Sequence, residues 1–201
     1  MYAMMREGSA WHDLKVVVKA ITEHKVDTRY AVMISDDTHP FTLLRDGHLD
    51  HIVRRAIQEG VDPITAVQMV TINCAQCFQM DHELGSIAPG KCADIIFVDN
   101  LEKFNVTRVM IDGDVVAENG KMCVEFAPYT YPDYAMHTMH VGETITPETF
   151  RISTQQKDTS MVRVMEIIPA RVGNFERRVK LNVENGCLNS DVSQDVLMTF
   201  V

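Results

Sequence analysis

Tyr30-Ala-Val-Met-Ile-Ser35 is a short, continuous apolar run, and two carboxylates, Asp36-Asp37, follow it directly. Such a run is typical of a strand that is buried on both faces of a parallel sheet. Parallel α/β folds bind ligands at the carboxyl ends of their strands, where both aspartates would lie. A carboxylate at that place can ligate a metal ion or act as a general base. An Asx turn or a helix N-cap at the strand exit is the structural alternative for this pair.

Helical periodicity surrounds this strand on both sides. Apolar residues at helical spacing predict a helix over residues 10–23, with Ser9 as its N-cap. A second helix is predicted over residues 48–59, where Gly60 stops it. Asp62-Pro63 starts a third, because proline favours the first helical position. The first part of the chain is therefore α/β material, interrupted by a polar segment at residues 38–46.

The pattern changes to β at Gly85, which opens the turn-rich stretch Gly85-Ser-Ile-Ala-Pro-Gly90. Turn residues then separate short strand-like runs, which predict a β-meander. After an irregular linking segment at residues 127–147, the pattern is β again up to the last residues. A sheet that stops on an apolar strand indicates either a truncated chain or an ordinary edge strand. The expected strands span residues 93–98, 106–111, 115–118, 150–153, 162–168, 178–183 and 197–201.

Composition limits the classes of function. The chain has 201 residues and a formal net charge of −9, from 19 Lys+Arg and 28 Asp+Glu. This acidic balance argues against a nucleic-acid or anionic-membrane partner. A transmembrane helix would need a run of ~18 apolar residues, which the sequence lacks. The first residues show no secretory signal, and an odd number of cysteines favours reduced thiols in the cytoplasm.

Histidines and cysteines offer weaker candidates for chemistry. His48 and His51 lie three residues apart on one predicted helix face, with His39 nearby in the sequence. A metal pair is conceivable, but surface or packing histidines are the alternative, since two nitrogens do not complete a catalytic site. Cys74-Ala-Gln-Cys77 has no second CxxC to pair with, so these thiols are expected to be buried and inert.

Two further motifs are ambiguous from the residues alone. Arg6-Glu-Gly-Ser9 stands before the first predicted helix, where it could line a pocket mouth or cap the helix. The glycine-rich stretch that ends in Lys91 is not a phosphate loop, because Cys92 stands where that pattern needs Ser or Thr.

Four motifs, taken in their order along the chain, resemble the amidohydrolase superfamily. Met33-Ile-Ser-Asp-Asp37 is similar to the end of that family's eighth barrel strand, where an aspartate follows. Thr71-Ile-Asn-Cys-Ala75 resembles the T-x-N-x-A helix after the barrel. The other two resemble the entry and the returning hairpin of the small β-sandwich. They comprise Gly85–Gly90 with Ala93-Asp94, and Val109-Met-Ile-Asp-Gly113 with Val116.

Within the superfamily, the chain resembles the adenine deaminase family. The similarity rests on Arg6-Glu-Gly-Ser-Ala10, on the two aspartates, on Asp46-Gly-His-Leu-Asp-His51 with Arg54-Arg55, and on the β-rich continuation from Phe150. It implies a fold of class α/β plus β, the C-terminal portion of a TIM-barrel amidohydrolase. Residues 1–84 would supply the last strand or strands and helices of the (β/α)8 barrel. Residues 85–126 would form the β-sandwich subdomain, and 127–201 a linker and the truncated start of a C-terminal domain.

The resemblance also implies a reaction, the hydrolytic deamination of adenine to hypoxanthine and ammonia in purine metabolism. A divalent metal would lower the pKa of a bound water towards ~7. Mn²⁺ is the expected ion, with Fe²⁺ or Zn²⁺ as alternatives. Asp36 is implied as the metal-contacting aspartate and catalytic proton shuttle. Asp37, His48 and Glu7 are implied as substrate-binding residues.

The same resemblance points to missing parts. The family's H-x-H pair, its bridging acidic ligand and most of its barrel do not occur in these residues. A complete eight-fold barrel alone takes ~250 residues. The chain alone is therefore expected to be inactive, because one aspartate cannot hold a catalytic metal that needs about three protein ligands. The full-length form is expected to be a cytoplasmic homo-oligomer without a nucleic-acid or membrane partner.

Two other functions stay open. The first is a cyclic amidase of the same superfamily, similar to a dihydroorotase or hydantoinase. The segment from Arg6 to Ala10 and the continuation past Phe150 argue against it. The second is a non-catalytic remnant, or a partner subunit that pairs with a separate N-terminal chain.

Overall fold

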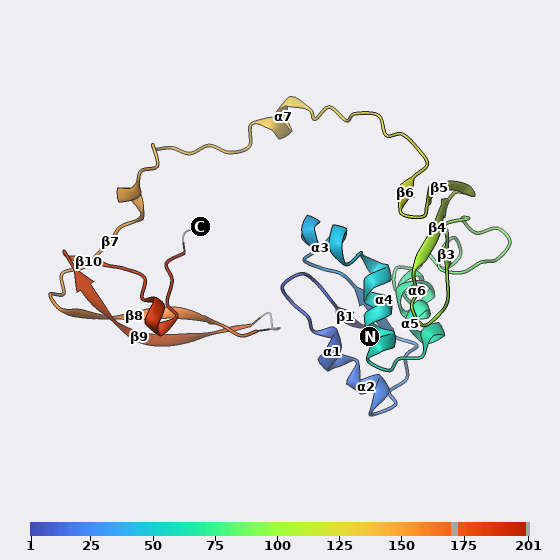
Figure 1. Ribbon diagram of the computed structural model, residues 1–201, viewed down its shortest axis with the longest axis horizontal. Coiled ribbons are helices and arrows are strands. Elements are labelled where there is room, and N and C mark those ends of the chain that lie inside the picture. Colours follow the sequence, from blue (N-terminus) through green and yellow to red (C-terminus); the bar gives the residue numbers. More distant parts are fainter. Residues whose placement is uncertain (170–172, 200–201) are drawn as a thin grey trace. The chain divides into compact units, whose positions relative to one another are not determined.

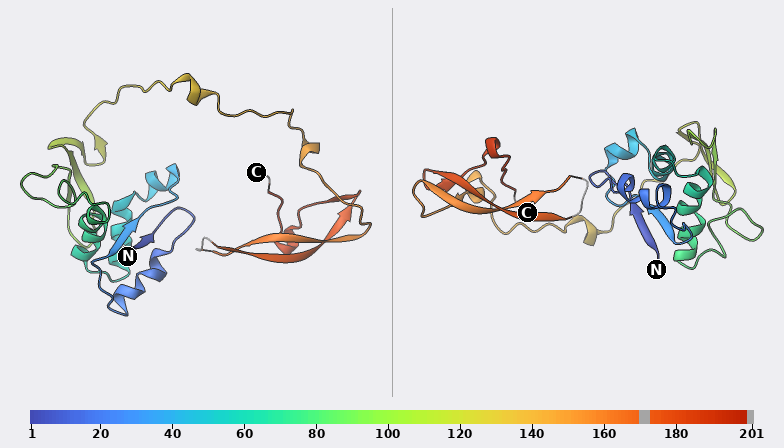
Figure 2. Two further views of the ribbon diagram at one scale, coloured as in Figure 1. Left: turned by 180° about the vertical axis from the view of Figure 1, so that it is seen from behind. Right: turned by 90° about the horizontal axis from the view of Figure 1, so that it is seen from below.

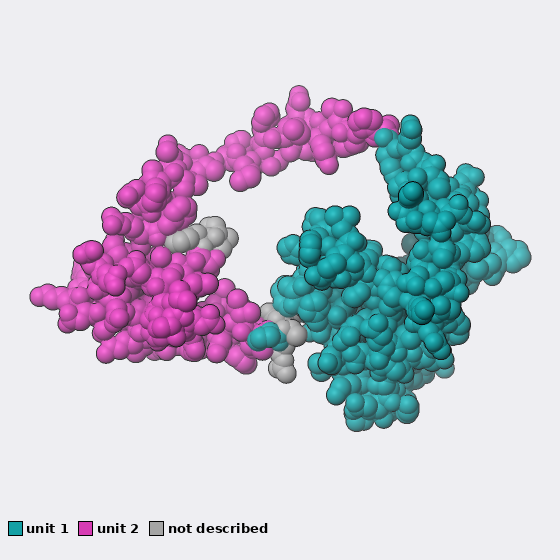
Figure 3. All heavy atoms as spheres, in the orientation of Figure 1, with its two compact units in different colours: residues 1–126, 169–171 teal, residues 127–168, 172–201 magenta. Residues whose placement is uncertain are grey.

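A computed structural model describes residues 1–169 and 173–199. The chain divides into two compact units (Figure 3). Unit 1 holds Met1–Phe126, and unit 2 holds Ala127–Ile168 and the described residues from 173 onward. The architecture is mixed α/β with antiparallel sheets, as the α/β-plus-β expectation requires at that coarse level. No helix in the described ranges is long and apolar enough to cross a membrane.

Unit 1 is built on two parallel strands, β1 (Ala3–Arg6) and β2 (Ala31–Ile34), which run side by side (Figures 1 and 2). Their register pairs Arg6 with Ile34. Strand β2 confirms the strand predicted from the apolar run, and its first three residues are buried. Strand β1 was not predicted, because a four-residue Ala-Met-Met-Arg stretch has neither β-branched residues nor an alternating pattern.

The single helix expected over residues 10–23 is wrong. Two short helices, α1 (Leu14–Val17) and α2 (Lys19–Thr22), take its place and meet at Val18. Ser9 is not the N-cap, since Asp13 holds that position. The Ser9 hydroxyl instead accepts the His39 backbone N–H at 2.8 Å and bonds to a threonine hydroxyl. These long-range bonds hold the residues after Ser9 in a loop, so the helix starts later.

The remaining helices of unit 1 agree better with the sequence pattern. The Asp62 carboxylate accepts the Thr65 backbone N–H at 3.0 Å and so caps the helix that begins at Pro63, as predicted. The helix at Pro40 was not predicted: it has six residues, and its apolar residues Phe41, Leu43 and Leu44 are exposed rather than buried. These helices are α3 (Pro40–Arg45), α4 (Leu49–Gln58), α5 (Pro63–Val70) and α6 (Ile72–Cys77).

The core of unit 1 lies between these helices and one face of the strand pair. Helix α1 contacts β1, while α4, α5 and α6 contact β2. Met5 and Met33 point into this core. Because side chains alternate along a strand, Arg6 and Ile34 lie on the opposite face. The core residues with almost no exposed surface include Leu14, Val18, Met33, Ile52, Val53 and Met69.

The Thr71–Ala75 motif has a structural role. Asn73 is buried, and its side-chain amide donates to the carbonyl oxygens of Thr28 and Ala31, both at 2.8 Å. It thereby ties α6 to the start of β2. Gly85 has φ +84°, and a Cβ there would lie 2.7 Å from the Ala75 Cβ. Only glycine allows this close approach between the turn and α6.

A four-stranded antiparallel meander follows, in the order β3-β4-β5-β6. This confirms the β-pattern expected after Gly85. The hairpin turn expected between the second and third strands is present, with Asp112 and Gly113 at φ +52° and +88°. The strands are β3 (Ile95–Val98), β4 (Val106–Ile111), β5 (Asp114–Glu118) and β6 (Lys121–Met122).

Unit 2 is a second antiparallel sheet, in the order β7-β10-β9-β8. An extended segment interrupted by the short helix α7 (Asp133–Met136) and the 3₁₀ helix η1 (Pro147–Phe150) precedes it (Figure 1). The strand expected at residues 197–201 is absent at 197–199, and its last two residues lie outside the described part. The strands are β7 (Ile152–Ser153), β8 (Thr159–Ile167), β9 (Asn174–Glu184) and β10 (Cys187–Leu188).

Candidate active site

The carboxyl ends of β1 and β2 meet at one edge, because the strands are parallel. The Glu7 backbone N–H donates to the Ile34 carbonyl at 3.1 Å, which extends the ladder one residue past β1. Beyond this hydrogen bond, the segments that follow β1 and β2 leave the strand pair, and their charged side chains lie at its edge. This edge brings together Arg6 and Glu7 from one strand and Asp36 and Asp37 from the other.

Arg6 joins two carboxylates at this edge. Its Nη1 donates to Asp36 Oδ2 at 3.0 Å, while Nε and Nη2 both donate to Asp13 Oδ2 at 3.0 Å. The guanidinium carbon lies 5.2 Å from the centre of the Trp11 ring. The hydrogen bond to Asp13 and, less strongly, that to Asp36 raise the pKa of Arg6, although burial acts against them. The arginine is therefore a fixed positive charge in direct contact with Asp36.

Asp36 occupies an unusual backbone conformation. Its φ is +69°, in the left-handed region that residues with a Cβ seldom adopt. Its side chain is 38% exposed, so a small molecule can reach the carboxylate. In the described part of the chain, only Oδ2 has a hydrogen-bond partner, which leaves Oδ1 available.

Asp37 is bonded to other parts of the chain. Its Oδ2 accepts the Ala10 backbone N–H at 2.8 Å, and its backbone carbonyl accepts the Ser9 N–H at 2.7 Å. A Cβ on Gly8 would lie 1.7 Å from Asp37 Oδ1, so only glycine fits against this carboxylate. Oδ1 is itself buried without a hydrogen-bond partner. Asp37 thus clasps the loop that follows β1.

Glu7 is buried, with a side chain that is only 6% exposed. Its Oε1 lies 3.1 Å from His12 Nδ1, while Oε2 is buried without a partner. Thr38 Oγ1 shares that condition. A buried acceptor without a donor lowers the stability of the folded state. Such groups are rare in folded proteins, which makes this edge of the sheet a candidate for function.

His48 comes to the same strand end from the start of α4. Its Nε2 lies 3.0 Å from Ser35 Oγ, and its backbone N–H donates to Asp50 Oδ1 at 2.8 Å. His48 and His51, considered as a metal pair from the sequence, do not belong to a larger cluster of candidate metal ligands among the described residues. In residues 1–169 and 173–199, no group of three or more His, Cys, Asp or Glu side chains could hold a metal ion.

The sequence pattern pointed to Glu7, Asp36, Asp37 and His48 but not to Arg6 and His12, which contact Asp36 and Glu7, nor to Trp11 and Asp13, which contact Arg6. Arg6 was noted only as part of a pocket mouth or helix cap, while Trp11, His12 and Asp13 were placed inside a helix. A charged residue at the last position of a short strand, followed by Glu7 and then Gly8, was the available signal. It becomes readable only once β1 is recognised.

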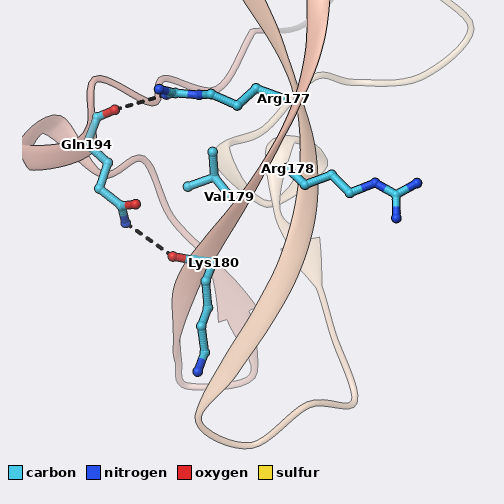
Figure 4. A pocket seen from close by; sticks show the side chains of 5 residues that line it. All are labelled: Arg177, Arg178, Val179, Lys180 and Gln194. Carbon is cyan, nitrogen blue, oxygen red and sulfur yellow. Dashed lines mark hydrogen bonds between the residues drawn. The ribbon is translucent and has the colours of Figure 1, made fainter.

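Two hollows are present, and the larger includes His48 of the candidate site in its lining. A groove of about 790 Å³ separates α4 and α5 from the β3–β5 sheet, and His48 and Asp94 are among its lining residues. A smaller hollow of about 410 Å³ lies on β9 (Figure 4). There Arg177 donates to the Gln194 backbone carbonyl at 3.3 Å, and the Gln194 amide donates to the Lys180 carbonyl at 3.1 Å. These bonds fasten the turn after β10 to β9, so they stabilise unit 2.

The cysteines offer no second site. All five are free, and burial raises the pKa of the Cys74 thiol, with a smaller contribution from Cys77. A raised pKa disfavours the reactive thiolate. The expectation of buried thiols is wrong, because Cys74 and Cys77 are only half-buried. The raised pKa of Cys74 agrees with the low reactivity expected of that thiol.

Comparison with known proteins gives a consistent family. The model of the Amidohydrolase family matches residues 12–116. An adenine deaminase from Clostridium botulinum (strain 657 / Type Ba4) is 61% identical over 201 residues, which are 100% of this chain and 34% of that protein. An adenine deaminase from Moorella thermoacetica is 50% identical over 197 residues, 98% of this chain and 33% of that protein. The chain thus spans about a third of the length of these curated relatives.

A solved structure titled as an amidohydrolase from Thermotoga maritima MSB8 is more distant. It is 18% identical, and the match covers 57% of this chain and 37% of that chain with a TM-score of 0.37.

Proposed function

The chain belongs to the amidohydrolase family, and from that premise we propose that it is part of an adenine deaminase that converts adenine and water to hypoxanthine and ammonia. The observation that carries the proposal is 61% identity, across all 201 residues, to a curated protein of that name. The arrangement at the edge of β1 and β2 supports it, because an accessible carboxylate stands there at the end of a buried parallel strand.

The proposed reaction moves both protons of the attacking water. The water oxygen bonds to C6 of adenine as the C6=N1 double bond opens and N1 gains a proton; the oxygen then loses its second proton as C6=O forms, and the amino group gains a proton and leaves C6 as ammonia. We assign this transfer to Asp36, whose Oδ1 is available while Oδ2 is held by Arg6. Glu7, Asp37 and His48 are the proposed purine-contacting groups. Carboxylate oxygens accept hydrogen bonds from the N–H groups that adenine carries.

The described residues do not by themselves fit a metal centre. They contain no group of three candidate ligands, and the Arg6 guanidinium already contacts Asp36. A structural or catalytic divalent ion needs about three or more protein ligands. We therefore derive no step through a metal. Our proposal is that Asp36 is one ligand, and that the others belong to parts of the relatives that this chain does not span. Mn²⁺ is the proposed ion, with Fe²⁺ or Zn²⁺ as alternatives.

The same premise extends to the architecture. We propose that residues 1–84 supply the last strands and helices of a TIM barrel, that 85–126 form its β-sandwich subdomain, and that 127–201 begin a C-terminal domain. The parallel pair β1–β2 with helices on one face supports the first assignment. A cytoplasmic homo-oligomer is the proposed state of the full-length protein.

A chimera tests this function. The 201 residues replace the matching stretch of the Clostridium botulinum relative, and the product of adenine is identified by chromatography with Mn²⁺ supplied. We expect hypoxanthine from the chimera and none from the 201-residue chain alone. Dihydroorotate and hydantoin serve as substrates for the cyclic-amidase alternative. Ring opening of either, without deamination of adenine, would contradict the proposal.

A further inference from the structure

We propose that Arg6 is a positioning residue for Asp36, which it holds so that a single carboxylate oxygen faces the reaction. This inference rests on the proposed function, because it assigns Arg6 a part in the same proton transfer. Arg6 itself is not proposed to touch the substrate.

The geometry of the guanidinium is the first argument. One edge of its planar fork, Nε and Nη2, binds Asp13 Oδ2, and the remaining nitrogen, Nη1, binds Asp36 Oδ2. All three distances are 3.0 Å. Both ends of the fork are therefore fixed at once, and neither carboxylate can turn without breaking a charge-assisted bond. A lysine ammonium could not span both partners in this planar way.

The behaviour of Asp13 is the second argument. It occupies the N-cap of α1, where an aspartate commonly accepts a backbone N–H of its helix, yet it makes no such bond. Its carboxylate binds Arg6 instead. The side chain at the capping position therefore holds Arg6 in place instead of capping the helix. This use of Asp13 is expected if Arg6 has a role beyond the stability of α1.

The third argument is the backbone of Asp36. A non-glycine residue at φ +69° carries backbone strain, which the surroundings must offset. The ion pair with Arg6 supplies such an attachment, and Arg6 is itself fixed against the ring of Trp11. Arg6 lies on the strand face opposite the helical core, so its role in packing that core is small.

The consequence is specific for catalysis. If Arg6 only orients Asp36, its loss lowers kcat and leaves KM nearly unchanged, because substrate binding uses other groups. Loss of a group that orients a catalytic side chain costs about 10–100-fold in activity. The effect should also vanish when Asp36 can no longer transfer a proton.

A double-mutant cycle in the chimera tests this. We expect Arg6→Met to lower kcat about 10–100-fold, with Arg6→Lys intermediate. In an Asp36→Asn background, Arg6→Met should have no further effect, since the residue that it positions is already disabled. Additive losses, or a change in KM alone, would overturn the proposal.

Arg45 offers a matched control. It bonds to both oxygens of Asp46, at 2.7 and 2.5 Å, and lies 5.1 Å from the Phe41 ring, so it makes the same kinds of contact as Arg6. Arg45→Met should therefore leave kcat within about two-fold of the unsubstituted chimera. An equal loss for Arg45→Met would indicate a general effect on the fold.

A second measurement keeps this inference separate from the proposed function. If the unsubstituted chimera does not deaminate adenine, the function fails, but the positioning can still be read in the 201-residue chain. The ¹³Cα and ¹³Cβ chemical shifts of Asp36 report its left-handed backbone. Arg6→Met should move them towards ordinary values and Arg45→Met should not. Unchanged Asp36 shifts in Arg6→Met would overturn the positioning role whatever the activity.

Discussion

The β1–β2 pair and the β8–β9 ribbon are both pairs of adjacent strands, yet they distribute charge in opposite ways. β1 and β2 are parallel, so their carboxyl ends coincide and collect Arg6, Asp36 and Asp37 at one edge. β8 and β9 are antiparallel, with charges spread along the ribbon, where Glu176 lies between Arg163 and Arg178. Parallel pairing thus concentrates chemistry at an edge, whereas antiparallel pairing spreads it over a face.

Burial differs in the same direction. The strand pair in unit 1 belongs to a core of twelve buried residues, to which several helices contribute. Among the described residues of unit 2, the ribbon shares four buried residues with its neighbours, Val179, Leu181, Leu188 and Val196. A larger core can hold strained and charged groups in place, as the conformation of Asp36 requires. We therefore expect the candidate site to depend on the core of unit 1.

The largest expected effect comes from truncating the two cores. Met33→Ala should cost about 2–5 kcal/mol, because Met33 is fully buried and leaves a cavity. Leu181→Ala, in the smaller core, is the comparison. Hydrogen exchange with mass spectrometry should show faster exchange over β2, α4 and α5 for the first variant and over β9 and β10 for the second. Equal acceleration in both units for either variant would contradict the description of two cores.

Substitutions at two glycines test the close approach between the turn at Gly85 and helix α6. Gly85 and Gly90 both have φ +84°, but a Cβ would meet Ala75 and Ile72 at Gly85 and nothing within 4 Å at Gly90. Gly85→Ala should therefore cost about 1–3 kcal/mol more than Gly90→Ala in urea unfolding. The backbone strain is common to both variants and cancels in the comparison. Equal losses would show that the contact with α6 contributes nothing.

Asn73→Ala probes the tie between α6 and β2. The variant leaves two carbonyl oxygens, of Thr28 and Ala31, without their donor, at an expected cost of about 1–3 kcal/mol. Fluorescence of Trp11, the sole tryptophan of the chain, reports unfolding of unit 1. Asn100→Ala, at an exposed turn, is the control. A midpoint unchanged by Asn73→Ala would mean that the motif does not hold the strand.

The smallest expected effect is on the pH dependence of the stability of the folded state. Partial burial raises the pKa of Asp50, but hydrogen bonds from the His48 backbone and the Arg54 guanidinium outweigh it, so the net pKa is lowered. The folded state therefore favours the ionised form. This stabilisation is complete above the ordinary aspartate pKa of about 3.9 and is lost as the pH falls through the lower folded value. Asp50→Asn should therefore make the decrease of the unfolding free energy at acidic pH smaller by about 0.3–1 kcal/mol.

Asp191 in unit 2 is the counterpart for that titration. Hydrogen bonds from Ser193 and then Gln194 lower its pKa, yet the carboxylate is exposed. Unfolding of unit 1, followed by Trp11 fluorescence as a function of pH, should therefore respond to Asp50→Asn and not to Asp191→Asn. The reverse result would contradict the assignment.

Much of the fold follows from local pattern. The apolar run that forms β2, the Asp62 cap of α5 and the turn at Asp112-Gly113 carry their signals within a few residues. The failures have a physical reason too. The loop after β1 is held by bonds between Ser9 and His39, thirty positions apart, which no local periodicity reveals. Because those bonds hold the residues after Ser9 in a loop, the helix expected from residue 10 does not begin there.

The candidate site divides in the same way. Asp36 follows from its place after a buried strand, since that place is visible in the sequence. The partnership of Arg6 with Asp13 and Asp36 depends on tertiary contacts seven and thirty positions apart. It could not be predicted while β1 was unrecognised.

The central claim is that Asp36, at the shared carboxyl edge of β1 and β2, is the proton-transferring group. Asp37 beside it is the matched control, because it has the same chemistry but clasps the loop after β1. The direct measurement is the kcat of adenine deamination by the chimera carrying Asp36→Asn or Asp37→Asn. We predict a loss of about 10²–10⁴-fold in kcat for Asp36→Asn, and for Asp37→Asn a smaller loss that includes a rise in KM. Full activity in Asp36→Asn would contradict the account.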